Sequence, residues 1–320
     1  MPDQGDILKY RIPNTGILHK QGVFRKSTAV ELTESFVVTG FDDNQACFFE
    51  ESERIEQLHF SEERPICYSK AEYLTIADKF IRRIQDQRLS KAILSRVKHF
   101  EVAVDVHAIF ETLCERYPTA FVYLISSPQF GTWIGATPEV LISSRGGIGR
   151  TVALAGTMKA TDQEKWGLKE QVEQQFVTDF ITEQLNAQQV QDLNILGPSD
   201  FLAGPVKHLE SKFRFSMRDQ NSLDLALKLH PTPAISGLPR EAALELIAEE
   251  ERHKRKLYSG FLGVLGNSSD LFVNLRCAQV IGNDWYLYLG GGFTKDSESE
   301  KEWEETENKS RTLLDILENT

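Results

Sequence analysis

Two pairs of glutamates are the residues of this sequence whose type and spacing most directly suggest chemistry. Glu302 and Glu305 lie three apart in a predicted helix, so both carboxylates fall on one helix face. Carboxylates placed in this way repel each other unless a positive charge lies between them, and a hard divalent cation would supply that charge. The alternative is a solvated acidic face on which Glu305 pairs with Lys309, four residues later. Glu170 and Glu173 repeat the spacing, so partners elsewhere in the chain must decide between a metal site and an ordinary surface.

A glycine run directly before this helix indicates where an anion would bind. The run comprises Gly290, Gly291 and Gly292, at the end of a predicted strand. Because glycine has no Cβ, backbone N–H groups can come close to a ligand there. Strand alternation over residues 270–281 turns Arg276 away from the apolar face, and a turn at 282–283 leads into the strand of the glycine run. The sequence therefore predicts a cationic side chain one strand away from an anion-binding backbone.

Helices must position several of these groups. Apolar residues at helical spacing predict helices over about 69–89, 106–117, 162–188, 223–227 and 241–256, and one more after Ser297. In the third of these, the predicted buried side consists of Leu168, Val172, Phe176 and Ile181. Ser297 with Glu300, or Ser299 with Glu302, is a candidate capping box for the last helix.

Strands are predicted from short apolar or alternating runs bounded by turn residues. They cover residues 35–40, 46–49, 91–104, 120–127, 131–137, 139–144, 146–157, 258–265 and 270–281. The three runs between 120 and 144 are predicted to form an antiparallel meander, and the last two runs a hairpin about Gly266–Asn267. Residues 190–218 are predicted to be irregular, and the proline-rich segment 230–239 to be a structured loop.

The composition excludes several classes of protein. The 320-residue chain has a net charge of −11 and no basic block that would neutralise a nucleic acid. Any anionic substrate must therefore be held by a few placed cations. Four scattered cysteines without CxxC spacing favour free thiols over a zinc site or a disulfide framework. No signal-peptide pattern and no apolar run long enough to span a bilayer are found, so we expect a cytoplasmic protein.

Nine segments follow one another in an order that is more specific than any single motif. They are KAILSR (91–96), GATPEVLI (135–142), ALAGT (153–157), KEQVEQ (169–174), HPTPAISGLP (230–239), YSGFLG (258–263), LRCA (275–278), LGGGF (289–293) and EWEET (302–306). In these segments the chain resembles the chorismate-utilising enzymes, which include isochorismate, salicylate, anthranilate and aminodeoxychorismate synthases. The resemblance implies a single mixed α/β (α+β) domain over 1–320, with two facing, mostly antiparallel sheets and helices outside. A catalytic core over 85–320 would follow a short N-terminal strand region over 1–65.

The resemblance also implies a role for each candidate residue. Lys91 resembles the base that activates water, and Glu139 resembles the acid that protonates the departing C4 hydroxyl of chorismate. Glu173, Glu302 and Glu305 resemble the carboxylates that hold Mg²⁺, which clamps the ring carboxylate. The residues that resemble binders of the substrate are Gly156, Thr157, His230, Tyr258, Arg276, Gly290, Gly291, Gly292 and Lys309. A dianionic substrate in an acidic protein needs such a metal and such cations, and a planar guanidinium suits a carboxylate.

Within this family, local features favour water as the nucleophile. Lys91 stands where anthranilate synthases carry glutamine, and Leu154–Ala155 precedes the GT motif where ammonia users show proline–isoleucine. We therefore expect an isochorismate synthase, a Mg²⁺-dependent isomerase that adds water at C2 of chorismate with loss of the C4 hydroxyl. A salicylate synthase, which would go on to eliminate pyruvate, is the main alternative, and an aminodeoxychorismate synthase or a silent homologue ranks lower. We expect a monomer whose product feeds menaquinone or siderophore synthesis, and Gln174, where the family often has histidine, is expected to change the metal geometry slightly.

Overall fold

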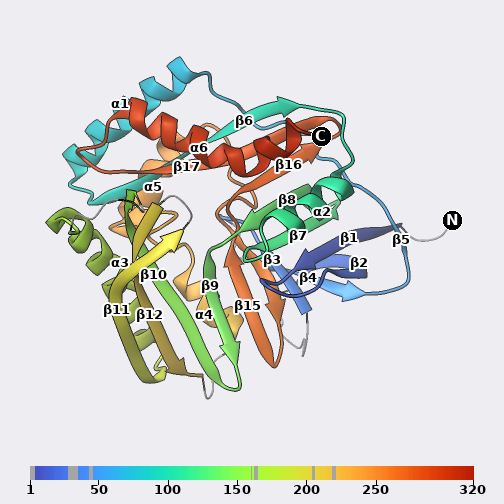
Figure 1. Cartoon of the computed structure of the whole chain (residues 1–320), viewed down its shortest axis with the longest axis horizontal. Coiled ribbons are helices and arrows are strands. Elements are labelled where there is room, and N and C mark those ends of the chain that lie inside the picture. Colours follow the sequence, from blue (N-terminus) through green and yellow to red (C-terminus); the bar gives the residue numbers. More distant parts are fainter. Residues whose placement is uncertain are drawn as a thin grey trace.

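The computed structural model describes residues 4–27, 35–42, 46–159, 161, 165–203, 206–217 and 221–320 (Figure 1). Its strands are β1 (Gln4–Arg11), β2 (Leu18–Ser27), β3 (Ser35–Thr39), β4 (Ala46–Glu51), β5 (Ile55–Glu56), β6 (Lys91–Glu101), β7 (Phe121–Ser127), β8 (Gly131–Thr137), β9 (Val140–Arg145), β10 (Ile148–Lys159), β11 (Gln191–Ala203), β12 (Val206–Ser216), β13 (Gly237–Leu238), β14 (Phe261–Leu265), β15 (Ser268–Val273), β16 (Cys277–Ile281) and β17 (Asp284–Phe293). Its helices are α1 (Lys70–Gln87), α2 (Val106–Arg116), α3 (Leu168–Ala187), α4 (Ser222–Leu229), α5 (Arg240–Glu250) and α6 (Ser299–Leu317). None of the described helices is long and apolar enough to cross a membrane.

Local sequence signals explain where several elements begin. Ser69 caps α1, and its side chain and that of Glu72 form a reciprocal capping box. Asp105 caps α2 by accepting the backbone N–H of His107. Two-residue turns join β14 to β15 and β16 to β17, as predicted. These starts follow from residues that are neighbours in the chain.

The strands form one continuous series of antiparallel neighbours. In space the series runs β13, β6, β17, β16, β8, β7, β1, β2, β4, β3, β14, β15, β9, β10, β12 and β11. The short β5 adds a parallel pairing to β1. The pairing of β6 with β17 brings the KAILSR and LGGGF segments side by side, although they are far apart in the sequence.

The series folds back on itself, so that its two halves face each other. Phe121 of β7 stacks on Phe272 of β15 with ring centroids 4.5 Å apart, although these strands are not paired. Tyr10 of β1 meets Phe36 of β3 in the same way, at 5.1 Å. Helices cover the outer faces: α2 and α6 share an apolar core with β7, β8, β16 and β17, and α1, α3, α4 and α5 share another with β9, β10 and β12 (Figure 1). This architecture agrees with the one that the resemblance implies.

The prediction that residues 190–218 are irregular is wrong, because the described residues of this segment form β11 and β12, which pair antiparallel. From Ser211 to Phe215 of β12, buried side chains alternate with the exposed side chains of Lys212 and Arg214. In the described part of the chain β11 pairs with β12 alone, and as an edge strand it leaves most of its side chains exposed. The prediction is wrong because an edge strand exposed on both faces has no apolar alternation to detect.

The predicted buried face of α3 is also wrong. Leu168, Val172 and Phe176 are 78%, 42% and 41% exposed, and only Ile181 of the predicted set is buried. The buried stripe consists of Gln174, Val177, Ile181 and Leu185. The hydrophobic pattern of the helix therefore misleads, because polar Gln174 is buried and the three apolar residues Leu168, Val172 and Phe176 are exposed. The helix begins at Leu168 rather than 162; residues 165–167 are not helical, and 162–164 lie outside the described residues.

Helix α5 ends six residues before the predicted position, at Glu250. Glu251 leaves the helix because its carboxylate accepts the backbone N–H of Ser95 at 2.7 Å and pairs with Arg255 at 2.7 Å. These contacts fix the loop after α5 against β6, the strand that carries Lys91.

Two strand predictions need correction. The run 139–144 does not continue the meander: β9 pairs with β10 and β15, and only β7 and β8 pair with each other. The predicted strand 270–281 is broken into β15 and β16, because Arg276 between them has φ of 51°, in the left-handed region. The break still leaves Arg276 at the start of β16, which pairs with β17.

Candidate active site

The glycine run lies within β17, opposite residues 93–95 of β6. A Cβ on the first, second and third glycine would lie 2.6 Å from Oη of Tyr258, 3.0 Å from Oε2 of Glu302 and 2.8 Å from Cε of Lys91. Since a real side chain does not tolerate the first and third of these distances, the glycines are what allow these groups to lie against the strand. Side chains from β6, from α6 and from the chain before β14 thus lie against the same three residues of β17.

Lys91 is the first residue of β6 and contacts a glutamate of α3. Its Nζ donates a hydrogen bond to Oε1 of Glu173 at 2.7 Å, and the two side chains are 14% and 21% exposed. Gln174 holds α3 in this position, since its Nε2 donates to the carbonyl of Ala153 at 3.1 Å and to Oγ of Ser211 at 3.0 Å. The amide of Gln174 therefore anchors the helix to β10 and β12.

Two carboxylates of α6 face the same place but have different partners. Oε1 of Glu302 accepts a hydrogen bond from Oγ of Ser297 at 2.8 Å, while its Oε2 is buried with no hydrogen-bond partner among the described residues. Burial raises the pKa of Glu302, and the charge of Glu305 adds to the rise. Glu305 pairs with Nζ of Lys309 at 2.6 Å. Burial acts to raise its pKa, but Lys309 and Lys91 outweigh burial, so the pKa of Glu305 lies below its ordinary value.

Ser297 was predicted to cap α6, and it does something else. The N-cap is Glu298, no side chain caps the helix, and neither predicted capping box forms. Ser297 instead orients the Glu302 carboxylate. The spacing of Ser297 before Glu300 indicated a capping box. The hydroxyl of Ser297 instead donates its hydrogen bond to the side chain of Glu302, and it does not cap the helix backbone.

Glu139 lies between β8 and β9, partly buried and surrounded by cations. Burial raises its pKa, and Lys91, Lys309 and Arg276 act in the opposite direction without cancelling the rise. The structure therefore brings Glu139 within electrostatic range of Lys91 and of the predicted substrate binders. A carboxyl group of this kind keeps its proton to a higher pH than a free glutamate does.

Arg276 and Lys309 form a connected pair beside the glycine run. Nη1 of Arg276 donates to the carbonyl of Lys309 at 3.2 Å, and Nζ of Lys309 donates to the carbonyl of Gly290 at 2.8 Å. Burial lowers the pKa of Arg276, and nearby Tyr258 and Glu305 oppose that effect. Two cations are therefore held beside the glycine run: among the described residues the Arg276 guanidinium donates a hydrogen bond through Nη1 alone, whereas Nζ of Lys309 already contacts Gly290 and Glu305.

The remaining predicted binders are Gly156, Thr157 and His230, and in the described part of the chain none of them makes a hydrogen bond with the groups named above. Gly156 of β10 has φ of +64° and its carbonyl accepts a hydrogen bond from Nδ1 of His208 at 2.8 Å. The side chain of Thr157 is outside the described part of the chain. Nε2 of His230 is 3.3 Å from the carbonyl of Phe41, and burial lowers the pKa of His230 to about 4. His230 is therefore neutral, and its role toward a substrate remains a prediction.

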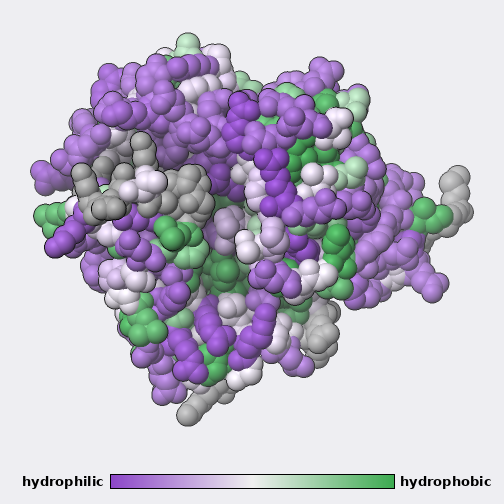
Figure 2. All heavy atoms as spheres, in the orientation of Figure 1, coloured by the Kyte–Doolittle hydropathy of each residue, from purple (hydrophilic) through white to green (hydrophobic). Residues whose placement is uncertain are grey.

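The surface is hollowed where these elements meet. Figure 2 shows a mostly hydrophilic face with a hollow near its centre, between the positions of α6 and β9 in Figure 1. The described residues contain no group of three His, Cys, Asp or Glu side chains already arranged around one point as a metal site. Oε2 of Glu302 nevertheless has no hydrogen-bond partner among the described residues, and hard cations prefer such carboxylate oxygens. With the carboxylates of Glu173 and Glu305, it gives the site oxygen donors of the type that Mg²⁺ prefers.

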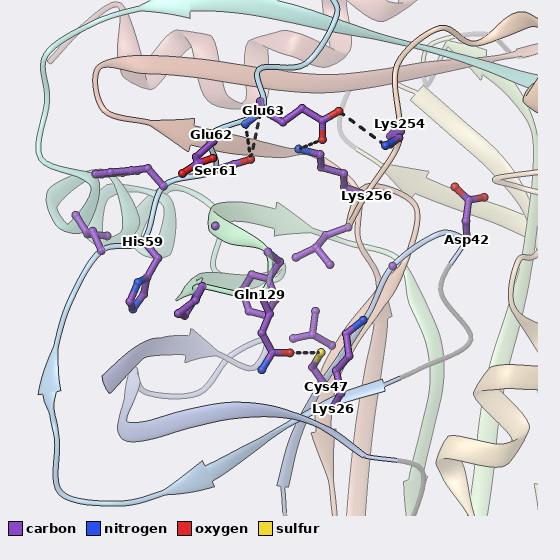
Figure 3. Close-up of a pocket in the computed structure, with 18 of the residues that line it drawn as sticks. Lys26, Asp42, Cys47, His59, Ser61, Glu62, Glu63, Gln129, Lys254 and Lys256 are labelled. Carbon is purple, nitrogen blue, oxygen red and sulfur yellow. Dashed lines mark hydrogen bonds and ion pairs between the residues drawn. The ribbon is translucent and has the colours of Figure 1, made fainter. Parts of the chain in front are cut away.

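A separate cavity of about 930 Å³ lies away from this cluster (Figure 3). Residues 57–63, the turn between β7 and β8 and the chain around Leu257 line it. Lys254 and Lys256 extend into its charged rim, where their Nζ atoms lie 3.8 and 3.5 Å from the carboxylate of Glu63. No predicted site residue is among those that line this cavity, so it is distinct from the candidate active site.

The whole chain can be compared with families of known proteins. The profile of the family described as "Chorismate binding enzyme" matches residues 19–318, almost the whole chain. The chain belongs to the chorismate-binding enzyme family.

Particular relatives are isochorismate synthases. Isochorismate synthase MenF of Escherichia coli (strain K12) is 30% identical over 249 residues, 74% of this chain and 58% of that protein. Isochorismate synthase EntC of the same organism is 29% identical over 246 residues, 72% of this chain and 63% of that protein. The matches therefore span less than two thirds of either relative. A solved Bacillus anthracis structure, assigned as a 2,3-dihydroxybenzoate-specific isochorismate synthase, DhbC, has a TM-score of 0.81 at 25% identity and covers 98% of this chain and 96% of that one.

Proposed function

We propose that the protein is an isochorismate synthase, which interconverts chorismate and isochorismate by adding water at C2 with loss of the C4 hydroxyl. One observation carries the proposal: Lys91 and Glu139 share one charged cluster, and the pKa of Glu139 is raised although three cations act on it. A general acid must hold a proton at the working pH, and a raised pKa provides for this. The isochorismate synthases among the relatives support the same activity.

In the proposed reaction, Lys91 accepts a proton from the water that attacks C2. Glu139 gives its proton to the C4 hydroxyl, which leaves as water, while the ring double bonds shift between these carbons. One water enters and one leaves, so the atoms balance. In the reverse direction the two residues exchange roles, as the interconversion requires.

The substrate carboxylates would be held by the cations beside the glycine run. Arg276 offers a planar fork that matches a carboxylate, and Lys309 adds a point charge. Backbone groups of 290–292 and of Gly156–Thr157, with the hydroxyl of Tyr258, would complete the contacts. Mg²⁺ bound by Glu173, Glu302 and Glu305 would neutralise the ring carboxylate.

The test is to incubate the protein with chorismate and Mg²⁺ and to identify the products by mass and ultraviolet absorbance. A mixture of chorismate and isochorismate is expected, and EDTA should prevent its formation. Glu305→Gln should lower metal-dependent turnover severely without unfolding the protein, whereas Glu304→Gln, at an exposed neighbour on the same helix, should not. Salicylate with pyruvate would indicate a salicylate synthase, and unchanged chorismate would contradict both.

We further propose that the protein acts in the cytoplasm as a monomer. None of the four cysteines, all within the described residues, forms a disulfide, as is usual for proteins of reducing compartments. Light scattering coupled to size exclusion should give the mass of one chain, and a mass of two chains would contradict the monomer.

A further inference from the structure

We infer that Lys91 and Lys309 compete with the divalent cation for the carboxylates of the proposed metal site, so that loading the cation releases both lysines toward the substrate. The inference rests on the proposed function, which identifies these carboxylates as metal ligands. The two lysines would then have a second role besides their role in the reaction: before the cation binds, they neutralise the negative charge of the carboxylates.

The contacts of the three glutamates support this. Glu173 is bonded to Lys91 at 2.7 Å, and Glu305 is bonded to Lys309 at 2.6 Å. Only Glu302 has a buried carboxylate oxygen without a hydrogen-bond partner among the described residues. Two of the three carboxylates are thus directed at different ammonium groups, which agrees with the finding that the described residues form no ready-made metal site.

Electrostatics gives the direction of the competition. An ammonium group and a hard divalent cation both bind carboxylate oxygens, and each supplies the positive charge that the other would supply. A cation that takes Glu173 and Glu305 as ligands therefore weakens both lysine contacts. Lys309 need not move far afterwards, because its Nζ also donates to the carbonyl of Gly290 at 2.8 Å. Lys91 loses its described carboxylate partner and is left beside the glycine run.

The test measures binding of Mn²⁺, a hard divalent probe visible by electron paramagnetic resonance, to the protein without chorismate, with Mg²⁺ as competitor. Lys91→Met and Lys309→Met should each tighten Mn²⁺ binding about three- to tenfold, the size expected for loss of one partly exposed ion pair. Lys91→Arg keeps the charge and the pair, so it should bind like the wild type. Lys98→Met is the matched control: Lys98 also joins β6 to α6, by a 2.6 Å contact with Glu307, which is not a proposed ligand.

A double-mutant cycle separates direct competition from a general effect of charge. Lys91→Met should give no gain in a Glu173→Gln background, because the carboxylate for which the lysine competes is absent. A gain of the same size there, an equal gain in Lys98→Met, or lysine variants that bind no more tightly than the wild type would each overturn the inference. If the wild type converts chorismate and binds Mn²⁺ but the lysine variants bind no tighter, the inference alone fails. If the wild type binds no Mn²⁺ and leaves chorismate unchanged, the proposed function fails with it.

Discussion

Replacing Lys91 with alanine should separate catalysis from substrate binding. Removal of a general base lowers turnover by about 10²–10⁴-fold, which is about 2.7–5.5 kcal/mol in the barrier at about 1.36 kcal/mol per factor of ten. Chorismate should still bind, because the cations proposed to hold its carboxylates are anchored independently of Lys91. Arg276 is held by the carbonyl of Lys309, and Lys309 by the carbonyl of Gly290.

The same substitution should change stability little. The pair with Glu173 is 14% and 21% exposed, so its contribution is nearer to the value of about 1 kcal/mol or less for accessible ion pairs than to that of a buried pair. An unfolding entropy of about 2.1 cal/mol/K per residue gives roughly 0.7 kcal/mol per kelvin for the 320-residue chain, so the melting temperature should fall by only about 1–2 °C. Lys98→Ala removes a similar lysine–glutamate contact from the same strand and should match this small shift while keeping full turnover.

The assay measures initial rates of isochorismate formation by chromatography and, separately, chorismate affinity by calorimetry in the presence of Mg²⁺. A large loss of turnover with affinity within a few-fold of the wild type is expected for the alanine variant. Water addition at the wild-type rate would refute the assignment of Lys91 as the base. An affinity loss as large as the loss of turnover would show that Lys91 acts through binding.

Three further changes test other parts of the site. Glu139→Gln should abolish proton donation. The folded pKa of Glu139 lies above its ordinary value of 4.5, so the wild type loses stability as pH rises from about 4.5 through the folded pKa. The glutamine variant has no such loss, and it should therefore become more stable relative to the wild type as the pH approaches neutrality. Thermal melts at several pH values check this, and a constant difference between the two proteins would contradict it. Arg276→Lys should raise the KM for chorismate about tenfold, since a point charge does not replace a bidentate fork; unchanged kinetics would show that Arg276 does not hold a carboxylate. Gly290→Ala should destabilise the protein by about 1–3 kcal/mol, because its Cβ would lie 2.6 Å from the hydroxyl of buried Tyr258. Gly291→Ala should cost less, because the nearest atom to its Cβ is Oε2 of Glu302 at 3.0 Å; denaturant melts that show equal losses would contradict this contrast.

The fold could be predicted from the sequence where a signal lies within a few residues. The helical spacing of apolar residues over 69–89 and the two-residue turn before β17 are such signals, and the structure has both of them. The prediction failed for the edge strand β11 and for the buried face of α3, where exposure is decided by neighbours that are distant in the chain. Burial of Gln174 depends on acceptors in β10 and β12, which no local pattern reveals.

The candidate site shows the same division between local and distant contacts. The spacing of Glu305 and Lys309 predicts their contact, because four residues are one helical turn. The contact of Lys91 with Glu173 joins residues 82 positions apart, and it depends on how α3 is anchored to the sheet. In the sequence, only the order of the motifs predicts that these two residues share one site.

The two interpretations of the acidic pair in α6, a metal site or an acidic face with an ion pair, do not exclude each other. Lys309 pairs with Glu305 at 2.6 Å, as the second interpretation requires. One turn earlier, Glu302 has a buried oxygen without a hydrogen-bond partner among the described residues, as the first would require. Carboxylates that lie close together and receive a cation late need a temporary positive partner that offsets their mutual repulsion. An ion pair that a metal can break meets that need, so the contact that first suggested an ordinary surface is compatible with a site that binds a metal.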